Sequence, residues 1–177
     1  MIRRNSPYLT VSAKLNLYKS MILPVLLYGS VCWYANVSNT RVLEAVQKRI
    51  TKWIFFDEDY TVRLKRLNLL PLSLYIQLQD LVTLSKIISD DYDFCWQSMA
   101  IVKISSVETR QHNIFANVRP HKKICEQNFW FRAPRLADLL PAKIAFKKKT
   151  GLKNRLLKLF WDYFTNSYIL HLSCSWK

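Results

Sequence analysis

The stretch from Lys14 to Phe56, KLNLYKSMILPVLLYGSVCWYANVSNTRVLEAVQKRITKWIFF, decides the fold of this 177-residue chain. It divides into an apolar segment that runs into Pro24, an aromatic turn around Gly29, and a basic amphipathic segment. Apolar side chains of the first segment recur at helical spacing: Leu15, Tyr18, Ile22 and Val25. Because proline lacks a backbone N–H, we expect this first helix to kink or end near Met21–Leu23.

The segment after the turn predicts a helix with two different faces. Its large apolar side chains fall on one face: Leu43, Val46, Ile50, Trp53 and Ile54. The opposite face carries cations at positions i, i+7 and i+11: Arg41, Lys48 and Lys52. We expect the polar run Asn36–Thr40 to cap this helix, and Trp33 and Tyr34 to cover the core that forms beside it. One face then packs against the first helix, and the other is free to meet an anionic partner.

Composition predicts a mainly α protein. Half of the residues are hydrophobic, which is enough for a packed core, and the whole chain has only two glycines. Sheet-rich folds need many tight turns and therefore many glycines, whereas helices need few. The formal net charge is +15 and the pI is about 9.9, which points to phosphate-bearing partners or an anionic surface.

We expect a four-part organisation. A loose segment, 1–13, precedes a small helical bundle at 14–89, an irregular connector at 90–128 and a C-terminal helical region at 129–177 that ends in a basic helix. The helices expected after the opening stretch are Thr61–Leu67, Leu72–Ile88, Phe129–Leu140 and Lys143–Tyr168. The acidic run Phe55–Tyr60 is expected to be a loop, and Asn68–Pro71 is expected to end the short helix before it.

The N-terminal half also imitates a membrane anchor. Residues 20–40 contain no charge and follow several basic residues. The apolar core of this segment is only about 15 residues long, shorter than the roughly 20 that a spanning helix needs, and it contains Pro24 and Gly29. A membrane-anchored basic protein is therefore an alternative, but membrane binding is not the favoured interpretation. The four scattered cysteines predict reduced thiols in an intracellular protein, with nucleus or cytoplasm left open: Cys32, Cys95, Cys125 and Cys174.

Two ordered motifs carry a resemblance to a known family. The series K-x-x-LYKS-x-x-x-P-x-LLYGS-x-x-W, then LE-x-VQKR-x-x-KWI, resembles the segment after the catalytic core of jockey-like non-LTR retrotransposon reverse transcriptases. In that family this segment is the thumb, so the resemblance implies that residues 14–89 form a thumb-like bundle. It also implies that the chain is a C-terminal fragment of an RNA-directed DNA polymerase, with the catalytic aspartates in the palm that would precede Met1.

The stretch TRQHNIFANVRPHKKICEQNFWFRAPRLADLLPAKI resembles the tail that follows the thumb in the same family. The matching positions are Thr109, Arg110, Arg119, Pro120, Phe129, Arg132, Ala133, Leu136, Leu140 and Pro141. The chain departs from the family at Ala137–Asp138, where the family has Trp-Asn. The closing FKKKTGLKNRLLKLF resembles the family's basic helix, so the resemblance extends from about Lys14 to Phe160.

No residue of the chain is expected to be catalytic. Polymerases of this family use carboxylates to hold two magnesium ions, and the clustered acids of this chain are Asp57, Glu58 and Asp59, and Asp90, Asp91 and Asp93. The DDYD string follows a predicted helix and lacks flanking hydrophobic strands, so we interpret both acidic runs as solvated loops. His121 and Cys125 are four residues apart, but a structural zinc site needs four ligands and no second pair is present. We therefore expect neither metal, cofactor nor small-molecule substrate.

The basic side chains are the strongest functional signal. The candidate nucleic-acid contacts are Lys14, Lys19, Arg41, Lys48, Arg49, Lys52, Arg63, Lys65, Arg66, Arg119, Lys122, Lys123, Lys147, Lys148, Lys149 and Lys153. The aromatic side chains at helical spacing are expected to be core rather than stacking groups: Trp53, Trp130, Trp161 and Tyr163. The sequence thus predicts sequence-independent binding to an RNA–DNA hybrid or duplex, and the resemblance implies the polymerase core as a second partner. An inert remnant of a truncated element is the remaining alternative.

Overall fold

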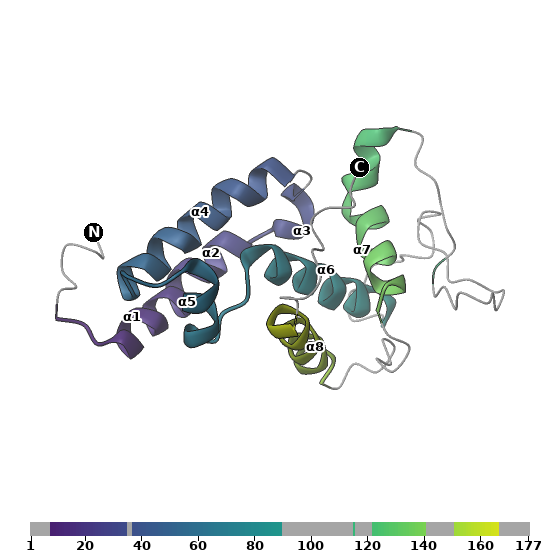
Figure 1. Cartoon of the computed structure of the whole chain (residues 1–177). Helices are drawn as coiled ribbons and strands as arrows, with labels where there is room; N and C mark the ends of the chain where they lie inside the picture. Colours follow the sequence, from purple (N-terminus) through teal and green to yellow (C-terminus); the bar gives the residue numbers. More distant parts are fainter. Residues whose placement is uncertain (1–7, 35–36, 90–114, 116–121, 141–150, 167–177) are drawn as a thin grey trace.

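A computed structural model describes residues 8–34, 37–89, 115, 122–140 and 151–166, and in these residues the fold is mainly α, as the composition predicts (Figure 1). The helical elements are α1 (Val11–Leu17), the π-helix η1 (Tyr18–Ile22), α2 (Leu23–Leu27), α3 (Ser30–Trp33), α4 (Val37–Ile54), α5 (Tyr60–Leu67), α6 (Leu72–Ile88), the 3-10 helix η3 (Lys123–Gln127), α7 (Phe129–Asp138) and α8 (Leu152–Asn166). Most of the expected connector, 90–128, lies outside the described residues.

Of the two outcomes expected for Pro24, a kink or an end of the first helix near Met21–Leu23, the end does not occur. The chain stays helical from α1 through η1 into α2, and in η1 the Leu23 N–H donates to the Tyr18 carbonyl, five residues earlier. This wider turn places Pro24 in the first turn of α2, where a missing N–H is tolerated. The extra width also changes which side chains face inward: Tyr18 is fully buried, but Val25, expected on the same face, is 73% exposed.

The aromatic turn forms at Gly29, whose backbone has a φ of 62°. This left-handed conformation favours glycine, and it separates α2 from the short α3. The Trp33 indole N–H donates to the Tyr28 carbonyl at 2.7 Å, so the ring closes the turn itself and remains 37% exposed instead of covering the core. Among the described residues, no helix has both the length and the apolar character needed to cross a membrane.

The buried face of α4 differs from the expected one. Ile54 is buried and Ile50 and Trp53 pack against the α1–η1 segment, as predicted, but Val46 is exposed. Two polar side chains, Gln47 and Thr51, are instead fully buried. They are tolerated because the Gln47 amide donates to the Leu70 carbonyl at 2.9 Å and the Thr51 hydroxyl donates to the Lys48 carbonyl at 3.1 Å. The Gln47 amide therefore links α4 to Leu70, between α5 and α6, while the Thr51 hydroxyl is satisfied within α4.

The start of α4 falls inside the run expected to cap it, and Asn36, the residue at the N-cap position, lies outside the described residues. The helix already begins at Val37, so most of the run Asn36–Thr40 lies inside it rather than before it. Thr40 does not cap the helix; its hydroxyl donates to the Tyr34 hydroxyl at 2.8 Å and so links α4 to the end of α3.

The predictions for α5 and α6 are confirmed. The structure places α6 at Leu72–Ile88, as expected, and α5 ends at Leu67, followed by Asn68 with a left-handed φ of 51°. The Glu44 carboxylate of α4 accepts the Leu72 N–H at 3.0 Å, so an acid from another helix satisfies the start of α6. The Tyr60 hydroxyl donates to the same carboxylate.

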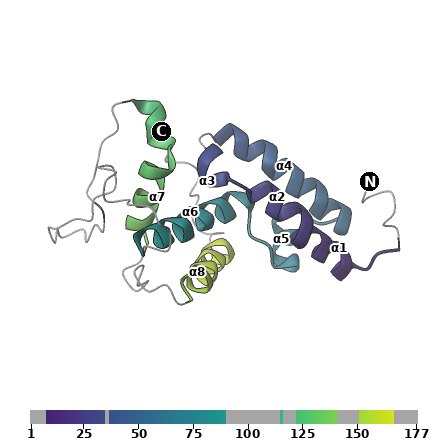
Figure 2. The same ribbon diagram turned by 180° about the vertical axis from the view of Figure 1, so that it is seen from behind.

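The described residues form two cores, and Phe164 of α8 packs against both. The first lies among α1, η1, α4 and α5 and consists of Tyr18, Ile54, Leu64, Leu67 and Leu69. The second contains Leu78, Leu81 and Leu84 of α6, Phe115, Phe129, Ala133 and Ala137 of α7 with its preceding segment, and Leu152, Leu156 and Phe160 of α8. Figures 1 and 2 show α6 in the middle, with α1, α2, α4 and α5 to one side and α7 to the other. Tyr163, expected to point inward from α8, is 40% exposed.

A buried ion pair connects α6 to α7. The Arg132 guanidinium donates to both carboxylate oxygens of Asp80, at 2.7 and 2.9 Å, and Asp80 is fully buried. The same guanidinium donates to the Tyr34 carbonyl, and to the Gln127 carbonyl at 2.7 Å. Burial raises the pKa of Asp80, and the bonds from Arg132 partly offset this effect. Arg132 therefore ties α6, α7 and the end of α3 at one point.

Removal of one partner of this pair should destabilise the protein strongly. We expect Arg132→Met to lower the free energy of unfolding by about 3–5 kcal/mol, because Asp80 is left buried without its partner. The double variant Asp80→Leu with Arg132→Met should lose far less, since no charge remains buried. Chemical denaturation followed by circular dichroism measures both, with Arg41→Met, an exposed arginine, as the control. A loss below about 1 kcal/mol for Arg132→Met would show that the pair does not hold α6 to α7.

Candidate nucleic-acid interface

The outward face of α4 gathers four cations. Arg41, Lys48, Arg49 and Lys52 are all exposed, and we call these four residues the α4 basic face. Val42, which is 68% exposed, Ala45 and Val46 lie between them. The one acid of α4, Glu44, is turned inward, where it accepts bonds from Tyr60 and from the start of α6. The face therefore presents positive charge without an acid of its own helix to neutralise it.

Aromatic rings support several of these cations. The Lys48 ammonium lies 5.3 Å from the centroid of the Tyr60 ring, and the Lys52 ammonium lies 5.1 Å from that of Phe56. Lys14 of α1 lies 5.0 Å from the Trp53 ring in the same way. Such contacts contribute about 0.5–1 kcal/mol at exposed sites, so they position the ammonium groups without holding them permanently.

The Tyr60 hydroxyl, on the inward side of the α4 basic face, stays uncharged. Burial raises the pKa of the Tyr60 hydroxyl, and its hydrogen bond to Glu44 and the charge of that carboxylate raise it further. Tyr60 therefore remains a neutral donor across the physiological range. The carboxylate of Glu44 is fully engaged beneath the surface, so the positive potential outside α4 comes from the basic face itself.

The cations of α5 are structural instead. Arg63, expected on the surface, is buried; its guanidinium donates to the Glu58 carbonyl and lies over the Tyr60 ring. Arg66 is exposed but pairs with the Glu58 carboxylate and lies 4.2 Å from the Phe55 ring. The half-buried Lys65 lies 5.9 Å from the ring of Phe164 in α8. Arg63 and Arg66 therefore hold the 55–59 loop, because its Glu58 carbonyl and carboxylate accept their hydrogen bonds. Lys65 contacts α8 through the ring of Phe164.

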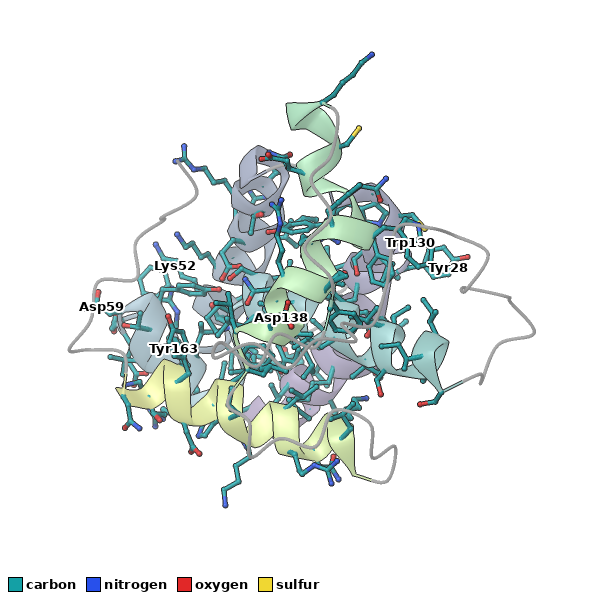
Figure 3. All side chains as sticks on the ribbon, turned by 90° about the vertical axis from the view of Figure 1, so that its right-hand side faces the viewer. Tyr28, Lys52, Asp59, Trp130, Asp138 and Tyr163 are labelled. Carbon is teal, nitrogen blue, oxygen red and sulfur yellow. The ribbon has the colours of Figure 1, made fainter. Side chains whose placement is uncertain are left out.

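The other candidates do not join the α4 basic face. Lys19 and Lys122 are exposed on η1 and just before η3, and Lys153 is exposed in the first turn of α8. All three views place α4 above α6 and α8 below it (Figures 1, 2 and 3). Four candidates lie outside the described residues: Arg119, Lys147, Lys148 and Lys149. Lys123 lies in η3, but its side chain is outside what the structure describes.

The aromatic predictions hold for most positions. Trp53, Trp130 and Trp161 are half-buried and pack against the two cores, as expected of core residues. The side chain that the sequence did not single out is Phe56, which is 75% exposed directly after α4. Its neighbour Phe55 packs against the first core, so the pair FF at the end of a helix was the available signal. Two adjacent aromatic residues at that point cannot both follow the buried face.

The carboxylates of the 55–59 loop do not form a metal site. Among the residues that the structure describes, no cluster of three or more His, Cys, Asp or Glu side chains is placed to hold a metal ion. Asp57 and Asp59 are exposed, and Glu58 pairs with Arg66. Cys32 and Cys125 are free thiols. The DDYD string, the three histidines, Cys95 and Cys174 lie outside the described residues.

Comparisons with known proteins identify no relative. No protein-family model, no curated protein and no solved structure matches the chain. The α4 basic face is therefore interpreted from its own charge and geometry.

Two cations that the sequence treats alike should behave differently. We expect Arg63→Ala to lower the free energy of unfolding by about 1–3 kcal/mol, because the Glu58 carbonyl loses its donor, and to leave the salt dependence of DNA binding unchanged. Lys52→Ala should change stability by less than about 0.5 kcal/mol and flatten the log–log salt slope by about 0.9. Denaturation and fluorescence anisotropy measure the two effects. The opposite pattern would mean that Arg63, not Lys52, contacts phosphate.

Proposed function

We propose that this chain is the thumb-containing C-terminal part of a non-LTR retrotransposon RNA-directed DNA polymerase, and that the α4 basic face binds the nucleic-acid backbone without reading base sequence. The observation that carries the binding proposal is the arrangement of α4 itself. Four exposed cations share one face, while the only acid of the helix is turned inward and occupied by Tyr60 and Leu72.

The length of the face suits a run of phosphates. Arg41 and Lys52 are eleven residues apart, which corresponds to about 16 Å along an α-helix, or roughly five nucleotide steps of one strand. Phosphate contacts fix the position of a duplex but carry no sequence information, so this face should bind any base order. An RNA–DNA hybrid should bind at least as well as duplex DNA, since the thumb of the resembled family grips such a hybrid.

The ancestry proposal has a separate support. Arg132 and Ala133 are two of the residues that carry the resemblance in the second motif. Arg132 forms the buried pair with Asp80, and Ala133 is fully buried in the second core against α6. Both residues therefore have a defined role in packing. This favours a real relationship to the resembled family over a chance match of the second motif. The missing polymerase core remains the proposed second partner.

The slope of binding affinity against salt tests the binding proposal. We expect Lys48→Gln, Arg49→Gln and Lys52→Gln together to flatten the log–log slope by roughly 2–3 units, because each lost phosphate contact removes about 0.9 on B-form DNA. A matched triple variant, Lys86→Gln, Lys153→Gln and Lys158→Gln, makes the same change in net charge on α6 and α8. Fluorescence anisotropy at several salt concentrations gives both slopes.

Equal slopes for the wild type and the α4 variant would contradict this proposal. A flatter salt slope in the Lys86, Lys153 and Lys158 control instead would place the phosphate contacts on the α8 side of the molecule. No binding to duplex DNA or hybrid at low salt would leave the inert remnant as the better account.

A further inference from the structure

The α4 basic face has a defined end. Lys52 is its last cation, the exposed ring of Phe56 follows directly after the helix, and the exposed carboxylates of Asp57 and Asp59 follow the ring. Figure 3 shows Lys52 and Asp59 on the same side of the molecule, opposite Tyr28 and Trp130. The surface therefore changes from positive to aromatic to negative within a few residues.

Phe56 is held outward by an anchored loop. Phe55 packs against the first core, and the Arg66 guanidinium lies 4.2 Å from its ring. Arg66 also pairs with the Glu58 carboxylate, and Arg63 donates to the Glu58 carbonyl. Phe55 before the ring and Glu58 two residues after it are thus held, which keeps the backbone of Phe56 beyond the end of α4.

The charges on either side of the ring limit what a bound backbone can do. Phosphates along α4 meet Arg41, Lys48, Arg49 and Lys52, but a backbone that continued past Phe56 would meet Asp57 and Asp59. Like charges at close range repel, and the repulsion grows as the contact loses water. A duplex that ends at Phe56 avoids these carboxylates and brings the flat face of its last base to the ring.

We propose that the α4 basic face binds the end of a nucleic-acid duplex, with the backbone along α4 and the terminal base stacked on Phe56. This inference rests on the proposed function and adds the kind of ligand that the face accepts. The Lys52 ammonium, now 5.1 Å from the Phe56 ring, would move from the ring to the last phosphate. The ring face that it leaves is the surface on which a base stacks.

Phe56 is the exposed ring beside the last cation of the α4 basic face, whereas Tyr163, 40% exposed on the same side in Figure 3, belongs to α8. Trp53 is half-buried in the first core and lies beneath Lys14. Tyr60 is half-buried, and its hydroxyl is bonded to Glu44. Stacking on either ring would require breaking contacts that hold α4, whereas stacking on Phe56 displaces only the Lys52 side chain.

Binding to linear and circular DNA tests the inference. A closed circular DNA and the same DNA cut into short fragments are compared as competitors at equal base-pair concentration against the full chain. We expect the fragments to bind about tenfold more tightly per base pair, a ratio that base–aromatic stacking energies readily supply. Phe56→Ala should remove this preference. Tyr28→Ala, an 85% exposed aromatic on the opposite side, should keep it.

A second measurement reports stacking directly. A duplex with 2-aminopurine as its terminal base should lose fluorescence when the wild-type chain binds, and Phe56→Ala should abolish this loss. Asp57→Asn with Asp59→Asn should raise the affinity for circular DNA and narrow the difference between the two forms, because the repulsion beyond the ring is removed.

The two proposals fail in different ways. Equal binding of circle and fragments, with a slope still flattened by the Lys48, Arg49 and Lys52 variant, would overturn the end preference and leave backbone binding in place. An equal loss of affinity for circular DNA and for the fragments in Phe56→Ala would also overturn the end preference. No binding to either form at low salt would overturn both proposals.

Discussion

The buried pair of Arg132 and Asp80 is the constraint on which the arrangement of the helices depends. Two buried charges are tolerated only when geometry and additional hydrogen bonds satisfy them, and Arg132 meets this condition with Asp80 and the carbonyls of Tyr34 and Gln127. The pair fixes α6 against α7 and the end of α3. Since α6 supplies Leu78, Leu81 and Leu84 to the second core, and Glu44 of α4 accepts a hydrogen bond from the Leu72 N–H at the start of α6, α4 is linked to the same helix that Arg132 holds.

The helices that form the cores also separate their polar and acidic side chains, which face inward, from their exposed cations. On α4 the inward side carries Glu44, Gln47 and Thr51, each with a hydrogen-bond partner, and the outward side carries cations. On α5 the arginines are occupied by the 55–59 loop. The positive charges that make up the net charge of +15 are therefore not spread evenly over the described surface. The α4 basic face is the part of the described surface where exposed cations stand together on one rigid element, which is what phosphate contacts require.

The sequence predicts most of the helices because strong local signals mark them. Asn68 and Pro71 separate α5 from α6, and apolar spacing defines the rest of α6. The errors come from contacts that local patterns do not contain. Gln47 is buried because the Leu70 carbonyl accepts its bond, Arg63 is buried because Glu58 lies within reach, and Asp80 finds its partner 52 residues away. In each case a polar residue that would usually lie in water has a partner, outside its own helix, that reduces the cost of burial.

Lysine footprinting of the wild-type chain tests, without any substitution, whether nucleic acid binds along α4. The chain is acetylated with and without saturating duplex at low salt, and the modified lysines are quantified by mass spectrometry. We expect strong protection of Lys48 and Lys52, with no protection of Lys86 and Lys153, which are exposed on α6 and α8. Protection of Lys153 with Lys48 and Lys52 unchanged would contradict binding along α4.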